Sequence, residues 1–471
     1  MKVEQLYTGC LAEAAYYIES NGEAAIIDPL RETKPYTELA EKNGVKIKYV
    51  LETHFHADFV SGHLDLARKT GGTIVFGPTA VPSFDALIAV DGEELKLGNV
   101  VIKVLHTPGH TMESSTYLLI DENGKDHALF TGDTLFIGDV GRPDLAVKNN
   151  LSKEDLAGYL YDSLQNKILP LADDVIIYPG HGAGSACGKN MSSETVSTLG
   201  IQKKLNYALR PDLNKAQFIK EVTNGLVEPP QYFPKDVGMN KNGYASIDEV
   251  IASGTRPFTP EEFLIVWDST NALVLDTRSK DIFPKGFIPG SVFIGIEDKF
   301  APWAGALIHD IQQPILIIAD EGREEEVVIR LARVGYDNTL GYLKGGITAW
   351  KNAGNEIDKI EEITAAHFED LYHSNPDTIN ILDVRKESEF NAQHLLAAKN
   401  FPLDFINRNM SMLDKSGKYY VHCAGGYRSL IASSILKSRG FHKVVNILGG
   451  FKALSETSLA KTNYKAPKTM L

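Results

Sequence analysis

Histidine and aspartate side chains cluster in one stretch near the N-terminus, Thr53-His54-Phe55-His56-Ala57-Asp58-Phe59. The stretch follows residues 47–52, a short run rich in apolar residues that predicts a buried strand. Neutral imidazole is the commonest protein ligand for metals, and a carboxylate two residues later can bind the ion or orient an imidazole. A polar turn whose histidines only form hydrogen bonds is the alternative for this stretch taken alone.

Three further segments place a His or an Asp just past a predicted strand. His110 ends Thr107-Pro108-Gly109-His110 after the strand expected at 100–105, and Asp133 ends Phe130-Thr131-Gly132-Asp133. His181 follows the strand expected at 175–178. Glycines in these segments let the backbone turn tightly beside an ion. Four strand ends that each deliver a His or an Asp predict a metal pocket.

Taken together, these motifs resemble the metallo-β-lactamase superfamily, whose H-x-H-x-D-H, G-H, G-D and final His motifs come in the same order. The resemblance spans roughly the first half of the chain. Hydrolases of that superfamily have a further His directly after the Asp, and this chain has Phe59 there. The resemblance therefore implies that a two-zinc hydrolytic site would lack one ligand of its second metal.

The residues that remain include His54, His110 and Asp133, two imidazoles and a carboxylate, and such a set with open positions suits Fe(II) that binds a substrate beside O2. The chain resembles the persulfide dioxygenase branch of the superfamily through four segments, residues 53–58, 107–111, 131–133 and 141–144. This resemblance implies one Fe(II) per chain, held by these three residues. It also implies that His56 and Asp58 support the ligands without binding the iron.

Three other residues near these motifs have open roles. The resemblance implies that His181, a ligand of the second metal in the hydrolases, forms hydrogen bonds near the open face of the iron. Cys187 lies in the Gly-rich stretch 182–189 and either faces the metal or is simply a small residue in a tight turn. Arg142 either binds substrate or pairs with Asp144 to hold its loop.

Composition is that of an ordinary soluble enzyme. The 471 residues suggest about three domains, and the net charge of -13 argues against binding nucleic acid or an anionic membrane. No apolar run approaches membrane-spanning length, and the N-terminus lacks the hydrophobic stretch of a signal peptide. We expect a cytoplasmic homo-oligomer, a dimer or tetramer, with Cys10, Cys187 and Cys423 as free thiols.

An internal repeat occupies the second half of the chain. Residues 274–278 recur as 381–385 in a similar pattern, offset by roughly 105 residues, the size of one small domain. In the second copy the strand expected at 419–422 leads into Cys423, at the base of a Gly-rich loop that opens a helix. Backbone N–H groups and the positive end of a helix lower the pKa of a thiol and cradle an anion.

This loop resembles the rhodanese active site. The resemblance implies that Cys423 is the nucleophile that carries a persulfide and that Arg428 stabilises anions. The other loop residues would form the cradle: Ala424, Gly425, Gly426, Tyr427 and Ser429. In the first copy Cys423 aligns with Asp320 and Arg428 with Glu325. Without a thiol, and with an acidic loop, the first copy should transfer no sulfur and serve as a structural or docking domain.

The fold class expected is α/β. We predict an N-terminal metallo-β-lactamase αββα sandwich over residues 1–244, an inactive rhodanese-like α/β domain over 245–357 and an active one over 358–471. Asn21-Gly22 between two apolar runs predicts a hairpin. Helical spacing is expected over residues 36–42, 64–69, 193–208 and 214–224.

The motifs together favour one function. An Fe(II) persulfide dioxygenase would oxidise a low-molecular-weight thiol persulfide with O2 to sulfite, and Cys423 would transfer sulfane sulfur to sulfite to give thiosulfate, thereby detoxifying sulfide. One alternative is a zinc-dependent thioester hydrolase of the glyoxalase II kind with an appended sulfurtransferase. Another is a sulfur carrier that uses Cys423 alone and tolerates the loss of His54.

Overall fold

The computed structural model describes residues 1–147, 150–297 and 299–466. The chain divides into two compact units. Unit 1 comprises Met1–Ile247 with the short segment Ala332–Gly335, and unit 2 comprises Asp248–Leu331 with most of the chain from Tyr336 onward. The end of the predicted third domain, residues 467–471, lies outside the described residues. The domain boundaries at 244/245 and 357/358 stay predictions.

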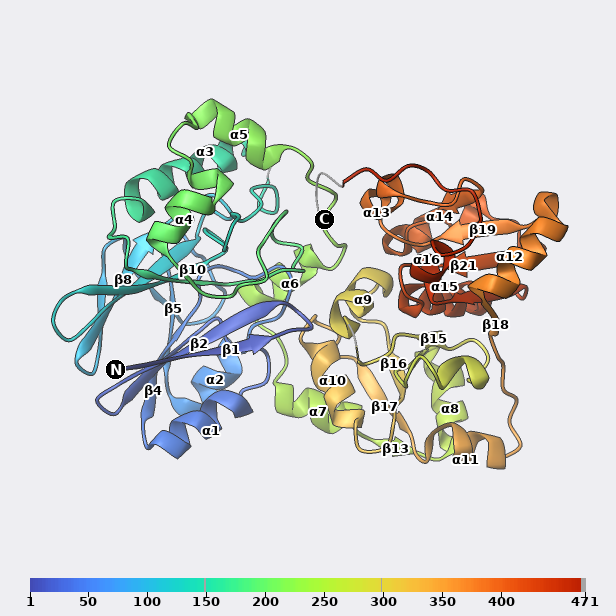
Figure 1. The fold of residues 1–471 in the computed structure, drawn as a ribbon. Helices are drawn as coiled ribbons and strands as arrows, with labels where there is room; N and C mark the ends of the chain where they lie inside the picture. The colour runs from blue at the N-terminus through green and yellow to red at the C-terminus, as the bar shows by residue number, and fades with distance from the viewer. Residues whose placement is uncertain (148–149, 298, 467–471) are drawn as a thin grey trace. The chain divides into compact units, whose positions relative to one another are not determined.

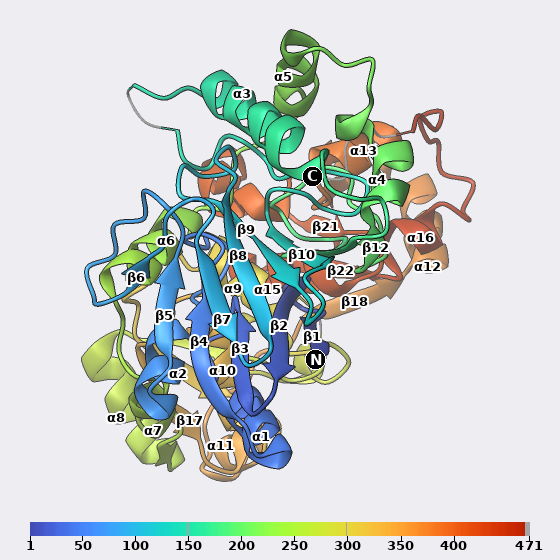
Figure 2. The same ribbon diagram turned by 90° about the vertical axis from the view of Figure 1, so that its left-hand side faces the viewer.

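Two six-stranded sheets form the centre of unit 1 (Figure 1). The first has the order β1-β2-β3-β4-β5-β6, with strands at Lys2–Thr8, Glu13–Ser20, Glu23–Ile27, Lys46–Leu51, Thr73–Phe76 and Leu87–Ile88. The second has the order β12-β11-β10-β9-β8-β7, with strands at Ser197–Thr198, Ile176–Pro179, Asp126–Gly132, Ser115–Ile120, Val100–His106 and Glu94–Leu97. Figure 2 shows β7, β8, β9 and β10 side by side in this second sheet.

Side-chain alternation along the strands makes these sheets the inner layers of a sandwich. On β2, Tyr16 and Ile18 face the second sheet and pack with residues such as Val104 and Phe130, while Tyr17 points to the other side. That outer face packs against α1 (Lys34–Asn43) and α2 (His63–Thr70). Successive residues of a strand point to opposite faces, so both faces are buried.

The outer face of the second sheet is covered in the same way. Leu129 and Ile177 of this sheet pack with Leu160 of α3 (Lys153–Ser163) and Phe218 of α5 (Lys215–Thr223). The two helical layers and two sheets confirm the αββα sandwich. The hairpin at Asn21-Gly22 is confirmed as well, since β2 and β3 pair antiparallel and both turn residues have positive φ.

One helical expectation in unit 1 is wrong in part. Residues 193–208 were expected to be helical throughout, but α4 spans only Leu199–Leu205, and β12 precedes it. Thr198 ends the strand and accepts a hydrogen bond from the N–H of Ile201, so it caps the helix that follows. Helix α6, Phe233–Asn242, was not expected, because the Pro-rich residues 228–234 at its start predict a loop.

Unit 2 holds two parallel five-stranded sheets. The first has the order β13-β17-β16-β14-β15, with strands at Pro257–Phe258, Thr339–Leu343, Ile315–Ile318, Leu273–Asp276 and Val292–Phe293. The second has the order β18-β22-β21-β19-β20, with strands at Glu361–Thr364, Val444–Leu448, Tyr419–His422, Asn380–Asp383 and Ala398–Asn400. The two orders are the same once the strands are numbered within each copy, so the fold confirms the repeat seen in the sequence.

Helices accompany both sheets of unit 2. Those of the first copy are α7 to α11, at Ile247–Gly254, Pro260–Thr270, Phe300–Leu307, Glu324–Ala332 and Gly346–Asn352. Those of the second are α12 to α16, at Ala365–Ser374, Glu387–Ala392, Ile406–Asn409, Tyr427–Ser438 and Gly450–Leu454. Among the described residues, no helix combines the length and the apolar character that crossing a membrane requires.

Candidate metal centre and thiol loop

Strand direction explains why distant segments of unit 1 meet at one point. Strands β8 and β10 are each antiparallel to β9, and β11 is parallel to β10, so all three end at the same edge of the sheet. His110, Asp133 and His181 lie in the segments that follow these three strands. The loop that carries His54 follows β4 of the facing sheet.

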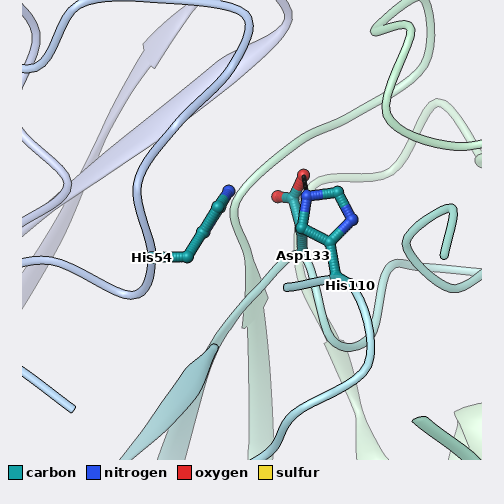
Figure 3. A group of neighbouring side chains, drawn as sticks. All are labelled: His54, His110 and Asp133. Carbon is teal, nitrogen blue, oxygen red and sulfur yellow. Dashed lines mark ion pairs between the residues drawn. The ribbon is translucent and has the colours of Figure 1, made fainter. Parts of the chain in front are cut away.

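The structure brings His54, His110 and Asp133 together. Their ligand atoms lie within 4.8 Å of one another, and all three residues are buried. In Figure 3 the His54 ring points toward Asp133 and His110 from a separate loop. The imidazole Nε2 of His110 is 3.4 Å from Asp133 Oδ2. Neither carboxylate oxygen of Asp133 has a hydrogen-bond partner among the described residues, and a buried carboxylate left in this way suits a metal ion.

The Nδ1 atoms of His110 and His54 each have a hydrogen-bond partner outside the group of three. His110 Nδ1 is 2.9 Å from the carbonyl oxygen of Arg142, which can only accept, so the ring donates from Nδ1. His54 Nδ1 is 2.9 Å from the Thr53 hydroxyl. Fixing Nδ1–H in this way leaves the lone pair of Nε2 available to a metal. Burial, reinforced by neighbouring imidazoles, lowers the pKa of His54, which favours the neutral ring that metals require.

His56 faces a pair of buried carboxylates. Its Nε2 lies 3.1 Å from Asp28 Oδ1 and 3.5 Å from Glu52 Oε2. Burial alone would lower the pKa of His56, but these carboxylates outweigh it and raise the pKa well above its ordinary value. A charged His56 is a poor ligand, so this arrangement suits the supporting role expected for it. Neither Asp28 nor Glu52 was singled out from the sequence, although each directly follows a strand.

His181 lies close to both Asp58 and Cys187, beside the first group. His181 Nε2 is 3.3 Å from Asp58 Oδ2 and 3.5 Å from Asp133 Oδ1. The ligand atoms of Asp133, His181 and Cys187 lie within 4.8 Å of one another, as do those of His56, Asp58 and His181. Cys187 therefore lies beside these side chains, and its role at a metal stays a prediction. The site has donor atoms for a second ion even though Phe59 offers none.

Arg142 is fully buried and forms hydrogen bonds to the loops that carry Asp144 and Cys187. Its Nε and Nη2 pair with the carboxylate of Asp144 at 2.7 and 2.8 Å, and its Nη1 donates to the carbonyl of Ala186 at 3.2 Å. Its backbone N–H donates to the carbonyl of Cys187. Of the two roles left open, pairing with Asp144 is the one that the structure contains.

Asn240 on α6 is a residue that the sequence analysis missed. Its side-chain amide donates to the carbonyl oxygens of His56 and Phe59, each at 2.8 Å, and accepts from the N–H of Ser61. These three bonds fix the loop that carries His54. No local pattern marks this Asn, because its partners lie in a distant part of the sequence.

The thiol loop of unit 2 has the expected local form. Cys423 follows β21, Gly426 adopts a φ of 109°, and α15 begins at Tyr427. The N–H of Gly426 donates to Cys423 Sγ at 3.1 Å. Beneath the loop, the N–H of Phe451 donates to the carbonyl of Cys423 at 2.6 Å. The sulfur thus lies against the beginning of a helix, where backbone N–H groups can donate to a bound anion.

Arg428 and Ser429 of this loop have partners inside the domain. The Arg428 guanidinium forms two hydrogen bonds to the Glu389 carboxylate, at 2.6 and 2.8 Å. Ser429 is buried, with its hydroxyl 2.7 Å from Asn446 Oδ1. Glu389 was not singled out from the sequence. Anion stabilisation by Arg428 stays a prediction, and the pairing shows that its charge is already partly balanced.

Comparison with known proteins agrees with this architecture. The sequence model described as the metallo-beta-lactamase superfamily matches residues 8–181. Human mitochondrial persulfide dioxygenase ETHE1 is 32% identical over 212 residues, covering 44% of this chain and 74% of that protein. The chain belongs to the metallo-beta-lactamase superfamily. The model described as the rhodanese-like domain matches residues 259–353 and 364–457, so this member of the superfamily is fused to two rhodanese-like domains.

Other relatives cover different parts of the chain. A crystal structure titled metallo-beta-lactamase from Staphylococcus aureus is 32% identical, covers 73% of this chain and 98% of that one, and superimposes with a TM-score of 0.64. The hydroxyacylglutathione hydrolase GloC of Haemophilus influenzae is 31% identical over 192 residues, covering 36% of this chain and 85% of that protein. The superfamily members similar to unit 1 therefore include both dioxygenases and hydrolases by name.

Proposed function

We propose that this protein is an iron-dependent persulfide dioxygenase joined to a sulfurtransferase. The first reaction would convert a low-molecular-weight persulfide, RSSH, with O2 and water into the thiol RSH, sulfite and two protons. The second would combine sulfane sulfur from another persulfide with that sulfite to give thiosulfate. Together the two reactions would remove sulfide-derived sulfur without accumulating sulfite.

The observation that carries this proposal is the buried group of His54, His110 and Asp133 on a chain that also carries the Cys423 loop. Two imidazoles and a carboxylate fit one Fe(II), which would supply the redox chemistry of O2. Phe59 is fully buried and has no lone pair, which supports one ion over a bridged pair. The 32% identity to human persulfide dioxygenase ETHE1 supports the same reaction.

Sulfur transfer would take place on Cys423. Its thiolate attacks the outer sulfur of RSSH, a new S–S bond forms, and the thiol RSH leaves with the proton. Sulfite then attacks the outer sulfur of the Cys423 persulfide, so thiosulfate leaves and the thiolate is restored. The Gly426 N–H, 3.1 Å from Cys423 Sγ, would hold the sulfur anion in both steps. The first rhodanese-like domain has Asp320 at the equivalent position and would transfer no sulfur.

The test is oxygen uptake with a panel of persulfides of glutathione, coenzyme A, cysteine and bacillithiol. Protein purified anaerobically and loaded with Fe(II) should consume O2 and form sulfite, with thiosulfate when persulfide is in excess. His54→Ala should abolish O2 uptake, whereas Cys423→Ser should keep it and release sulfite alone. A chain that forms neither sulfite nor thiosulfate from any of these substrates contradicts the proposal.

A zinc-dependent thioester hydrolase is the second candidate. It is favoured by the donor atoms of Asp58 and His181 beside the first group, and by the relatives named as hydroxyacylglutathione hydrolases. Metal analysis separates the two functions, since one iron per chain supports the dioxygenase and two zinc ions support the hydrolase. Hydrolysis of a glutathione thioester by the zinc-loaded protein would establish this second function.

The remaining parts of the proposal concern the state of the protein in the cell. We expect a cytoplasmic homo-oligomer, a dimer or a tetramer. Its three cysteines are free thiols in the structure, in keeping with a reducing compartment. Sedimentation of the purified chain measures the oligomeric state directly.

A further inference from the structure

Tyr427, within the thiol loop, forms a hydrogen bond outside its own rhodanese-like domain. It is the first residue of α15 and follows Gly426, whose N–H contacts Cys423 Sγ. Its hydroxyl donates to the carbonyl oxygen of Gly295, at 2.8 Å. Gly295 lies just beyond β15 in the first rhodanese-like domain, and both residues belong to unit 2. The loop that carries the thiol is thus tied to the copy that has none.

The contact around this hydrogen bond is closely fitted. The rings of Phe293 and Tyr427 meet edge to face with centroids 6.0 Å apart. A Cβ added at Gly295 would lie 3.3 Å from Tyr427 Cε2, 3.2 Å from the Arg278 carbonyl oxygen and 2.9 Å from Phe293 Cζ. A larger residue at position 295 would therefore displace the Phe293 ring, which packs against Tyr427, and would crowd the Tyr427 ring itself.

A second hydrogen bond joins the same two elements. β15 is the last strand of its sheet and pairs only with β14 among the described strands, so one of its edges is free of strand partners. The N–H of Phe293 on that strand donates to Ser434 Oγ of α15 at 2.9 Å. Phe293 and Ser434 are both fully buried. Helix α15 therefore covers the strand edge and takes a fixed position against it.

We propose that the first rhodanese-like domain positions the thiol loop of the second, and that Tyr427 is the positioning residue through its bond to Gly295. Residue 427 begins the helix whose N-terminus faces the sulfur, so a shift there moves the Gly426 N–H relative to Cys423 Sγ. That N–H and the helix end stabilise the sulfur anion. The domain without a thiol would thus set the reactivity of the one that has it. This inference rests on sulfur transfer by Cys423.

Tyr427→Phe in the full-length chain tests the proposal, because it removes only the hydroxyl. We expect kcat/KM for sulfur transfer from thiosulfate or glutathione persulfide to fall by about five- to tenfold, the effect of losing one hydrogen bond. We also expect the pH profile of Cys423 alkylation by iodoacetamide to move to higher pH, because the Gly426 N–H would no longer be held against Cys423 Sγ. Gly295→Ala should produce the same two changes.

Asn407→Ala is the matched control. The Asn407 side chain donates to the Leu307 carbonyl at 3.0 Å, a hydrogen bond between the same two domains but outside the loop. We expect this variant to keep the transfer rate and the alkylation profile of the wild type. If Asn407→Ala lowered the transfer rate as much as Tyr427→Phe, any contact between the two domains would have the same effect. That result would overturn the specific role of Tyr427. Unchanged rate and profile in Tyr427→Phe would overturn it as well.

Two readouts keep this proposal separate from the proposed function. If the wild type transfers no sulfur, the sulfurtransferase function fails, but the alkylation profile of Cys423 still reports whether Tyr427 positions the loop. Circular dichroism and the urea midpoint of each variant check that unit 2, which carries the substitutions, is folded. A shifted alkylation profile in a folded variant supports positioning, and an unshifted one contradicts it.

Discussion

The Thr53 hydroxyl lies 2.9 Å from His54 Nδ1 and connects that imidazole to a buried carboxylate. The same oxygen is 2.8 Å from Asp28 Oδ2. A hydroxyl has one proton, so when it donates to the carboxylate it must accept from the Nδ1–H of His54. This chain of bonds directs the lone pair of His54 Nε2 toward His110 and Asp133. Thr53 and Asp28 therefore orient the imidazole of His54, which we predict to be a metal ligand.

Replacing Thr53 by Val tests this connection. Val has nearly the same shape but no oxygen, so His54 Nδ1 and Asp28 each lose a partner. We expect the affinity for Fe(II) to fall by about 10- to 100-fold, the usual effect of removing a group that orients a ligand. Competition against a chelator of known affinity, under anaerobic conditions, measures it. Thr53→Ser keeps the hydroxyl and should keep the affinity, so equal binding by the Val and Ser variants contradicts the prediction.

A second prediction concerns the space behind Asp133. A Cβ at Gly180 would lie 2.8 Å from Asp133 Oδ1 and 3.1 Å from the carbonyl carbon of Gly132. Gly180→Ala should therefore displace the carboxylate and weaken Fe(II) binding by at least about tenfold, because ligand geometry tolerates shifts of only about 0.5 Å. Iron retained after gel filtration measures the loss.

Gly9→Ala is the control for that variant. A Cβ at Gly9 meets no atom of the described residues within 4 Å, so this substitution should leave the iron content unchanged. Sulfur transfer by Cys423 should persist in both variants, because that thiol belongs to unit 2. A Gly180→Ala protein with full iron content would show that the added Cβ does not displace the Asp133 carboxylate.

The grouping of residues at the candidate metal centre could be predicted in large part because these residues follow strands. His110, Asp133 and His181 sit in short loops that begin where apolar runs end, and local pattern is enough to find such positions. Asn240 could not be found in this way. Its role depends on hydrogen bonds to His56 and Phe59 that form only when α6 folds back over the loop. Side chains that act through tertiary contacts leave no periodic signal.

The thiol loop illustrates the same limit. The order of Cys423, Gly426 and Arg428 predicted a loop that opens a helix, and the structure confirms that form. The sequence did not reveal that Arg428 pairs with Glu389, because the two residues lie on different helices. Nor did it reveal the bond from Tyr427 to Gly295, which joins two copies of the repeat. Local patterns identify the reactive group, whereas its electrostatic partners come from the fold.

The environment of Cys187 predicts a thiol that reacts slowly. Burial, together with the carboxylates of Asp58 and Asp133, raises the pKa of Cys187 well above its ordinary value. The thiolate is the reactive form, so little of it is present at neutral pH, and reactivity should grow only well above pH ~8.5. We expect alkylation of Cys187 in folded, metal-free protein to be at least about tenfold slower than that of Cys10, which is partly exposed.

Peptide mapping by mass spectrometry after timed exposure to iodoacetamide, at pH values from 7 to 9, measures both rates in one sample. Cys10 is the internal reference for reagent and pH. Labelling of Cys187 at the rate of Cys10 would mean that the thiol is accessible and ionised, and it would contradict the buried environment.

The pairing of Glu389 with Arg428 predicts how stability depends on pH. Burial alone would raise the pKa of Glu389, but the hydrogen bonds and charge of Arg428 outweigh it and lower the pKa. A carboxyl whose pKa is lower in the folded state adds stability above its unfolded pKa, about 4.3, and loses it as the pH falls through the folded value. Glu389→Gln should thus reduce stability at pH 6 to 7, and the difference from wild type should shrink below pH ~4.3.

The size of that difference is limited by solvent. The Glu389 side chain is 35% exposed, so the pair should contribute no more than about 1 kcal/mol. Urea titrations from pH 3.5 to 7, followed by circular dichroism, measure it. Glu387→Gln, an exposed position on the same helix, is the control and should show no such pH dependence. If the difference between wild type and Glu389→Gln stays constant across this range, the lowered pKa is wrong.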